Sequence, residues 1–89
     1  MYKIFYSPKS TENLQEIFSY ISKDNSFYAA KVITSIKNTI DILKIFPISG
    51  NKIGNINRFI VNSYYKYKIV YKVNKMGVFV VSISKYRDF

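Results

Sequence analysis

The chain has 89 residues, a length that suits one domain, residues 1–89, with a single hydrophobic core. It is strongly basic, because 14 Lys and Arg against 5 Asp and Glu give a formal net charge of +9. The sequence contains neither Cys nor His, which excludes a disulfide framework, thiolate chemistry, an imidazole acid or base and the usual zinc sites. We therefore expect neither a metal nor a cofactor.

The apolar runs of the chain are much shorter than the roughly 18 residues needed to cross a bilayer. The opening segment, residues 2–6, also lacks the apolar stretch and cleavage site of a signal peptide. A hydrophobic content of 48% is typical of a folded domain. The sequence therefore predicts a folded cytoplasmic protein without a membrane partner.

The first half of the chain predicts one short strand and two helices. Residues 2–6 alternate as in a strand, and Ser7 and Pro8 then suit the N-cap and first position of a helix. The apolar positions of this first helix follow a spacing of three and four residues: Leu14, Ile17, Phe18 and Ile21. A turn at residues 23–26 leads to a second helix, for which either Asn25 or Ser26 can be the N-cap. Together the helices predict an antiparallel hairpin.

The apolar stripe of the second helix comprises Ala29, Val32, Ile33, Ile36, Ile40 and Leu43. Residues 46–50, with Pro47 and Gly50, are expected to stop this helix, and residues 50–55 to form a polar loop.

In the second half the apolar period becomes two. This pattern predicts strands over residues 58–61, 64–73 and 78–84, with a hairpin loop at residues 74–77. The fold class is therefore α+β in the order β-α-α-β-β-β, an antiparallel sheet covered on one face by the helical hairpin. In the long strand, one face carries Tyr65, Tyr67, Ile69, Tyr71 and Val73, and the other carries Lys66, Lys68, Val70 and Lys72. We expect the tyrosine face to meet the helices and the lysine face to be open.

The basic charge is concentrated in this second half. Residues 51–89 hold eight Lys and Arg and one acid, Asp88, whereas residues 1–50 hold six bases and four acids. A cationic, tyrosine-rich sheet predicts a polyanion or an acidic protein as the partner.

Several short segments in this order resemble the RelE/ParE superfamily of bacterial toxins, and the ParE branch, often called plasmid-stabilisation proteins, more than RelE. The resemblance covers essentially the whole chain. It rests on Tyr20-Ile21 followed by Asp24-Asn25, on Tyr28-Ala29-Ala30-Lys31, on Phe46-Pro47-x-x-Gly50, on Tyr67-Lys68-Ile69-Val70-Tyr71 and on Tyr86-Arg87-Asp88.

The resemblance implies the toxin of a type II toxin–antitoxin pair, held inactive by a cognate acidic antitoxin in a hetero-oligomer. Two targets compete. ParE-like members inhibit DNA gyrase and need no catalytic residues, whereas RelE-like members cut mRNA on the ribosome. The basic charge agrees with an acidic antitoxin segment that folds on binding.

An mRNA endonuclease needs a group that activates the ribose hydroxyl, a proton donor and cations for the phosphorane charge. The candidates are Arg58, Lys66, Lys85, Tyr86 and Arg87. Many RelE relatives carry a histidine where this chain has Ser84 or Lys85, and its absence weakens the endonuclease hypothesis. We therefore favour a gyrase inhibitor over an enzyme.

The residues predicted to bind the antitoxin or the target are Arg58, Lys66, Lys68, Lys72 and Arg87. Each also has an ordinary structural interpretation. Arg58 could pair with Asp41, Asp88 could pair with Arg87, and the lysines could form a solvated strand face.

A second alternative function is a basic nucleic-acid-binding module, which would need exposed aromatic residues interleaved with lysines. The strand pattern instead separates the two kinds of residue onto opposite faces.

Overall fold

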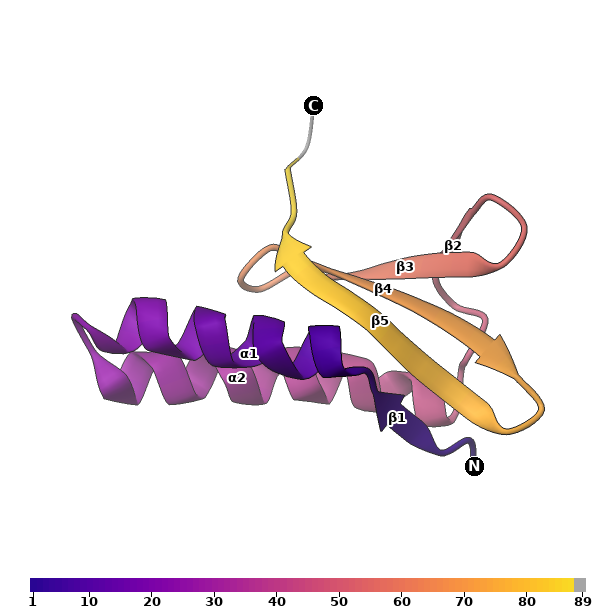
Figure 1. The fold of residues 1–89 in the computed structure, drawn as a ribbon, viewed down its shortest axis with the longest axis horizontal. Helices are drawn as coiled ribbons and strands as arrows, with labels where there is room; N and C mark the ends of the chain where they lie inside the picture. Colours follow the sequence, from indigo (N-terminus) through magenta and orange to yellow (C-terminus); the bar gives the residue numbers. More distant parts are fainter. Residues whose placement is uncertain (88–89) are drawn as a thin grey trace.

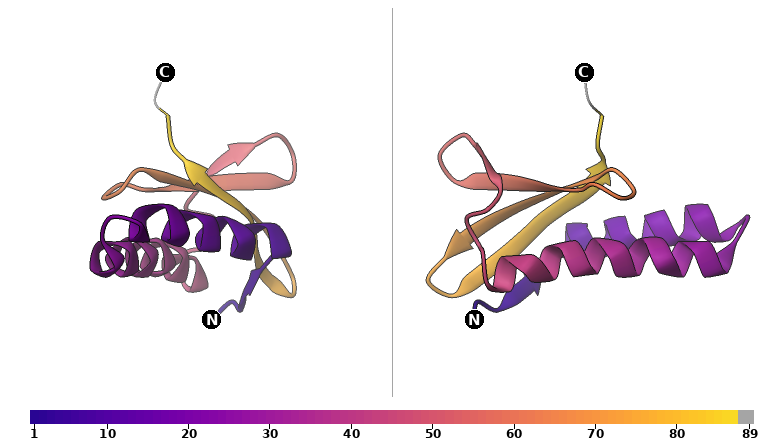
Figure 2. Two further views of the ribbon diagram at one scale, coloured as in Figure 1. Left: turned by 60° about the vertical axis from the view of Figure 1, so that its left-hand side comes forward. Right: turned by 180° about the vertical axis from the view of Figure 1, so that it is seen from behind.

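The computed structural model describes residues 1–87 and consists of a helical hairpin beneath a five-stranded mixed sheet (Figures 1 and 2). The elements in chain order are β1 (Ile4–Tyr6), α1 (Pro8–Ser22), α2 (Ser26–Asp41), the 3₁₀ helix η1 (Ile42–Lys44), β2 (Asn51–Ile53), β3 (Asn57–Asn62), β4 (Tyr67–Asn74) and β5 (Gly77–Lys85). The strand order is β1-β5-β4-β3-β2, with β1 parallel to β5 and the other pairs antiparallel. The α+β prediction, with helices on one face, is confirmed.

Both helices begin at polar caps. The Ser7 side chain accepts a hydrogen bond from the Ser10 amide at 3.0 Å, and the Asn25 side chain accepts one from the Tyr28 amide at 2.9 Å. The expected cap at Ser7 is thus confirmed, and Asn25 is the cap of α2. The α-helical part of α2 ends at Asp41, before the expected stop at residues 46–50, because the chain tightens into η1 before Pro47.

The core lies between the helices and the sheet. The residues of α2 and η1 predicted to form an apolar stripe are buried, apart from Ile33, which is half-buried. They pack against the face of β4 that carries Tyr67, Ile69 and Tyr71, as the period of two predicts. The segregation of tyrosines inward and lysines outward therefore holds for residues 67–72.

Three features of the sheet differ from the expectation. β1 runs parallel to β5, and residues 51–53, expected in a loop, form the edge strand β2. The strand predicted over residues 64–73 begins only at Tyr67, because residues 63–66 form a turn in which Lys66 has a φ of 62°. The turn breaks the alternation at Tyr64 and Tyr65.

A β-bulge in β5 joins the sheet to α1. Val70 pairs with Ser82 but Tyr71 pairs with Val80, which leaves Val81 as an extra residue. The Val81 carbonyl accepts a hydrogen bond from the Ser7 hydroxyl at 2.9 Å. The cap of α1 is thereby fixed to the sheet.

Candidate functional site

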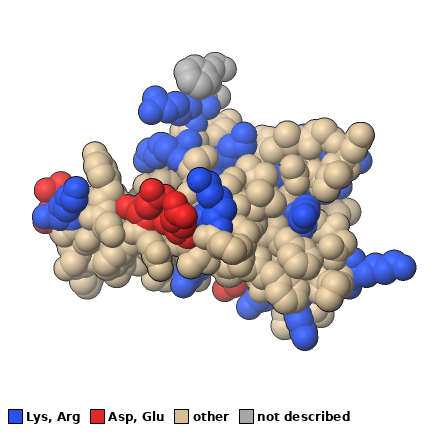
Figure 3. All heavy atoms as spheres, in the orientation of Figure 1, with Lys and Arg blue, Asp and Glu red and all other residues tan. Residues whose placement is uncertain are grey.

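Charge is distributed unevenly over the molecule. The four acids within residues 1–87 all lie in the helical hairpin: Glu12, Glu16, Asp24 and Asp41. Figure 3 shows acidic atoms gathered over α1, with Lys and Arg atoms spread over the sheet and near the C-terminal end. Among the described residues the only ion pair joins Lys44 to Asp41, at 3.4 Å. Within residues 1–87, the bases of the sheet therefore make no internal ion pair and are available to an acidic partner.

The sheet face that points away from the helices, here called the open face, combines apolar and cationic side chains. Lys68 and Lys72 lie on it, and the Lys68 ammonium is 4.8 Å from the centroid of the Phe59 ring. Phe5 and Phe79 stack at 4.8 Å between centroids. An acidic peptide with apolar side chains would find complementary groups on this face.

Arg58 lies away from the open face. In the β3–β4 ladder it pairs with the buried Tyr71, so its side chain leaves the sheet on the helix side. Its guanidinium donates to the carbonyls of Ile48 at 3.3 Å and Gly50 at 3.0 Å. The alternative pairing with Asp41 is not formed, because Asp41 pairs with Lys44. Arg58 therefore fixes the chain before β2 and does not share a surface with Lys68 and Lys72.

The other predicted residues meet where β5 ends and β4 begins. The Tyr86 amide donates to the Lys66 carbonyl at 2.8 Å, and the Lys85 ammonium donates to the Tyr65 carbonyl at 3.1 Å. The same ammonium lies 4.7 Å from the centroid of the Tyr67 ring. The fold thus gathers Lys66, Lys85 and Tyr86 at one end of the sheet. Arg58 lies near the opposite end of β3.

Arg87 lies beside this group, in a hollow between α1 and β5 of about 640 Å³. The hollow is lined by Asn13, Glu16, Ile17, Tyr20, Ile21, Tyr67, Ile83, Lys85 and Arg87. Asp88, the expected partner of Arg87, lies outside the described residues. Arg87 and Lys85 give this hollow two cations against the carboxylate of Glu16.

The phenol of Tyr67 at this end of the sheet is poorly suited to act as a base. Burial raises the pKa of Tyr67 above its ordinary value of 10.0, and the nearby phenol of Tyr28 raises it further. The Tyr67 phenol stays protonated at neutral pH, and the chain has no imidazole to take a proton from a ribose hydroxyl. The end of the sheet is therefore better suited to binding an anion than to general acid–base catalysis.

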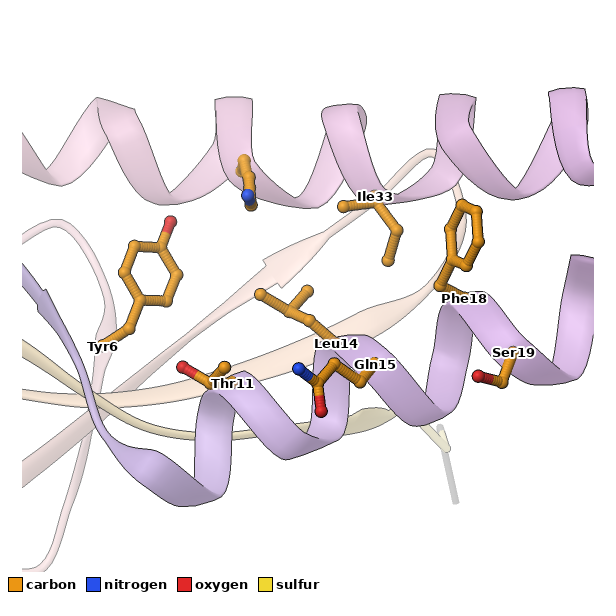
Figure 4. Close-up of a pocket in the computed structure, with 8 residues that line it drawn as sticks. Tyr6, Thr11, Leu14, Gln15, Phe18, Ser19 and Ile33 are labelled. Atoms are coloured by element: carbon orange, nitrogen blue, oxygen red, sulfur yellow. The ribbon is translucent and has the colours of Figure 1, made fainter.

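A groove between the helices was not expected from the sequence. It measures about 510 Å³ and opens between α1 and α2, with the sheet behind it in the view of Figure 4. Leu14, Phe18 and Ile33 supply its apolar walls, and Lys37 adds a cation. The periodicity of α1 assigned Phe18 to the core, whereas its side chain is 40% exposed. The apolar stripe of α1 is broader than one buried face of a helix, and this breadth was the sequence feature that could have indicated an exposed apolar residue.

Within residues 1–87, no helix is long and apolar enough to span a bilayer. The described part of the chain also has no group of three or more Asp, Glu, His or Cys arranged to hold a metal ion.

Comparison with known proteins assigns the family. The model of the ParE toxin of the type II toxin–antitoxin system parDE matches residues 4–88. The fold is similar to a structure of the chromosomal ParDE system from P. aeruginosa, with a TM-score of 0.83 and 14% identity over 98% of both chains. It is also similar to the isolated E. coli RelE toxin, with a TM-score of 0.63 and 20% identity over 100% of this chain and 88% of the other. No curated protein sequence matches. Because the family model covers nearly all of the sequence, this chain belongs to the ParE toxin family of type II toxin–antitoxin systems.

Proposed function

We propose that this protein inhibits DNA gyrase in the bacterial cytoplasm and is neutralised by a cognate acidic antitoxin. Membership of the ParE toxin family is the observation that carries the proposal. The sequence supports it independently, because a net charge of +9 without His suits a protein that binds an acidic partner better than one that cuts RNA.

The open face is the proposed contact surface for the antitoxin. Lys68 and Lys72 would pair with acidic side chains, and the Phe5–Phe79 stack would cover apolar ones. Lys68→Glu together with Lys72→Glu reverses two charges on this face. We expect this double variant to bind the antitoxin at least about tenfold more weakly, with a smaller salt dependence. Lys9→Glu together with Lys23→Glu makes the same charge change on α1 and its C-cap, and is the matched control.

The target is tested by comparing two purified systems. The protein is added to gyrase with relaxed plasmid and ATP, and in parallel to a reconstituted translation reaction. We expect loss of supercoiling at protein concentrations that leave translation intact, and recovery of supercoiling when the antitoxin is added. Arrest of translation with cleaved mRNA and normal supercoiling would overturn the proposal.

The second candidate function is a ribosome-dependent mRNA endonuclease. The observation that favours it is the meeting of Lys66, Lys85 and Tyr86 beside Arg87 at one end of the sheet. The translation assay decides it, since Tyr86→Phe and Arg87→Ala should then abolish cleavage while the protein stays folded.

A further inference from the structure

Four aromatic residues gather where the turn between β3 and β4 lies over α2 (Figure 2, right). Phe27 and Tyr28 come from the first turn of α2, and Tyr64 and Tyr65 come from the β3–β4 turn. The Tyr28 and Tyr65 rings meet edge to face at 5.7 Å, and the Tyr64 and Tyr65 rings lie 4.7 Å apart. We call these four residues the aromatic cluster.

Most of the aromatic cluster faces solvent. The side chains of Phe27, Tyr28 and Tyr64 are 72%, 45% and 80% exposed, whereas Tyr65 packs against the core and supports the other rings. Leaving a large apolar ring in water gives up the stabilisation that burial would provide. Core packing therefore does not explain the position of Phe27 and Tyr64.

The rings of Phe27, Tyr64 and Tyr65 border a hollow of about 480 Å³, and Lys31 is the charged residue of its lining. The hollow is lined by Phe27, Ala30, Lys31, Thr34, Ser35, Asn38, Tyr64 and Tyr65, none of which is acidic. The Lys31 ammonium lies 5.2 Å from the centroid of the Phe27 ring. Lys66 follows in the same turn, and the Lys85 ammonium bonds to the Tyr65 carbonyl. Asp24, in the connection before α2, is the acid nearest to Phe27 along the chain.

These groups match the chemistry of an unpaired nucleotide. Exposed aromatic rings stack with bases, lysines pair with phosphates, and the exposed side chains of Thr34 and Asn38 can hydrogen-bond to base edges. The strand β4 separates its lysines from its tyrosines, but this hollow brings exposed rings and Lys31 together. We infer that it is a binding site for single-stranded nucleic acid. The inference goes beyond gyrase inhibition and does not depend on which target the toxin has.

An acidic peptide explains the cluster less well. Such a peptide would use Lys31 but would gain little specific binding from the flat rings of Phe27 and Tyr64, which are 72% and 80% exposed. Stacking on an exposed face is a property of bases and is tolerant of sequence. The exposed rings therefore favour a single strand, and a peptide becomes an outcome of the test.

The test measures binding of a fluorescein-labelled oligodeoxythymidylate of about twelve nucleotides, within the usual range for single-strand sites, by fluorescence anisotropy at several salt concentrations. Tyr64→Ala and Phe27→Ala remove the two most exposed rings of the cluster. Phe46→Ala is the matched control, because Phe46 is 61% exposed and follows η1, at the other end of the α2–η1 segment from Phe27. Lys31→Ala tests the phosphate contact, and circular dichroism confirms that each variant is folded.

We expect Tyr64→Ala and Phe27→Ala each to weaken binding about fivefold or more, as for the loss of a stacking ring, while Phe46→Ala leaves binding unchanged. Lys31→Ala should lower the slope of log affinity against log salt by about 0.7. An oligonucleotide carrying 5-iododeoxyuridine should crosslink to Tyr64 or Phe27. Three results would overturn the inference. The first is binding that is equally weak in all three aromatic variants, and the second is crosslinking only on the open face. The third is displacement by polyglutamate as efficient as displacement by unlabelled oligonucleotide. Gyrase inhibition that persists without oligonucleotide binding would overturn it without touching the proposed function.

Discussion

Asn62 is the residue whose substitution tests the packing of the sheet on the helices most directly. It ends β3, is 2% exposed, and its side-chain amide donates to the Ser35 hydroxyl and the Thr39 hydroxyl, each at 2.9 Å, and to the Ser35 carbonyl at 3.2 Å. Its side-chain oxygen accepts from the Tyr65 amide at 2.8 Å. One buried side chain thus joins α2, β3 and the turn that carries the aromatic cluster.

Asn62→Asp keeps the shape of the side chain but replaces the donating amide by a carboxylate oxygen. The two N–H groups that serve these three acceptors are lost, at about 1 kcal/mol each, and a carboxylate then faces the Ser35 carbonyl in a buried site. Adding the desolvation of the charge, we expect a loss of about 4 kcal/mol in the free energy of unfolding at pH 7, a large part of the about 5–15 kcal/mol of an ordinary domain. Urea unfolding followed by circular dichroism measures it.

The pH dependence separates the charge from the lost contacts. Burial should raise the pKa of the carboxyl group introduced by Asn62→Asp, so the folded state holds its proton more tightly than the unfolded chain does. The variant should therefore be most stable at acidic pH and lose stability as pH rises through that raised pKa. Asn62→Ala loses the donated hydrogen bonds and also the one accepted from the Tyr65 amide, but it adds no charge and should show no added pH dependence. A stability within about 0.5 kcal/mol of the unchanged protein at pH 7, or equal pH slopes in the two variants, would refute the reasoning.

Three further predictions concern the chain before β2 and the buried phenols. Gly50→Ala should destabilise the protein by more than about 3 kcal/mol in urea unfolding, because a Cβ would lie 2.5 Å from the Phe59 carbonyl oxygen. Gly54→Ala is the control: its Cβ meets no atom within 4 Å, and it should cost only about 1 kcal/mol for its left-handed backbone. Tyr71→Phe removes the oxygen that accepts from the Gly50 amide at 2.9 Å, so the melting temperature should fall by an amount equivalent to about 1 kcal/mol, and an unchanged melting temperature would contradict this role. The pKa of Tyr67 is raised above 10.0 in the folded state, so the stability contributed by its neutral phenol is complete below about pH 10 and is lost as pH rises above that value. The urea midpoint should therefore fall between about pH 9 and pH 11, and Tyr67→Phe should make this fall smaller.

The helices and the inner face of the sheet could be predicted from the sequence because burial imposes a period on them. The stripe of α2 and the inward positions of β4 are apolar at the spacing that one buried face requires. β2 could not be predicted, since residues 51–53 are all exposed and show no apolar alternation. The extra residue at Val81 likewise leaves no mark, because it lies in the apolar run of residues 78–81, which has the composition of a regular strand.

The candidate site was harder to predict, because it depends on where the strand alternation stops. Residues 64–73 continue a period of two without interruption, yet the chain turns until Lys66, which adopts a left-handed backbone that glycine or asparagine usually occupies. Reading the strand through this turn placed Tyr65 on the inner face and Lys66 on the open face. The side of the sheet on which Arg58 lies was equally unpredictable, because it depends on the pairing of Arg58 with Tyr71.

The left-handed Lys66 is held in place by contacts that the strand pattern could not supply. Its amide donates to the Asn62 carbonyl at 2.7 Å, and its carbonyl accepts from the Tyr86 amide beyond the end of β5. A non-glycine residue in this conformation costs about 1–2 kcal/mol, which these bonds and the Asn62 network offset. The turn is therefore fixed from both sides, by α2 through Asn62 and by the C-terminal segment through Tyr86. Because the same turn carries Tyr64 and Lys66, a ligand bound at the aromatic cluster would contact the turn that is hydrogen-bonded to Tyr86, the residue before Arg87.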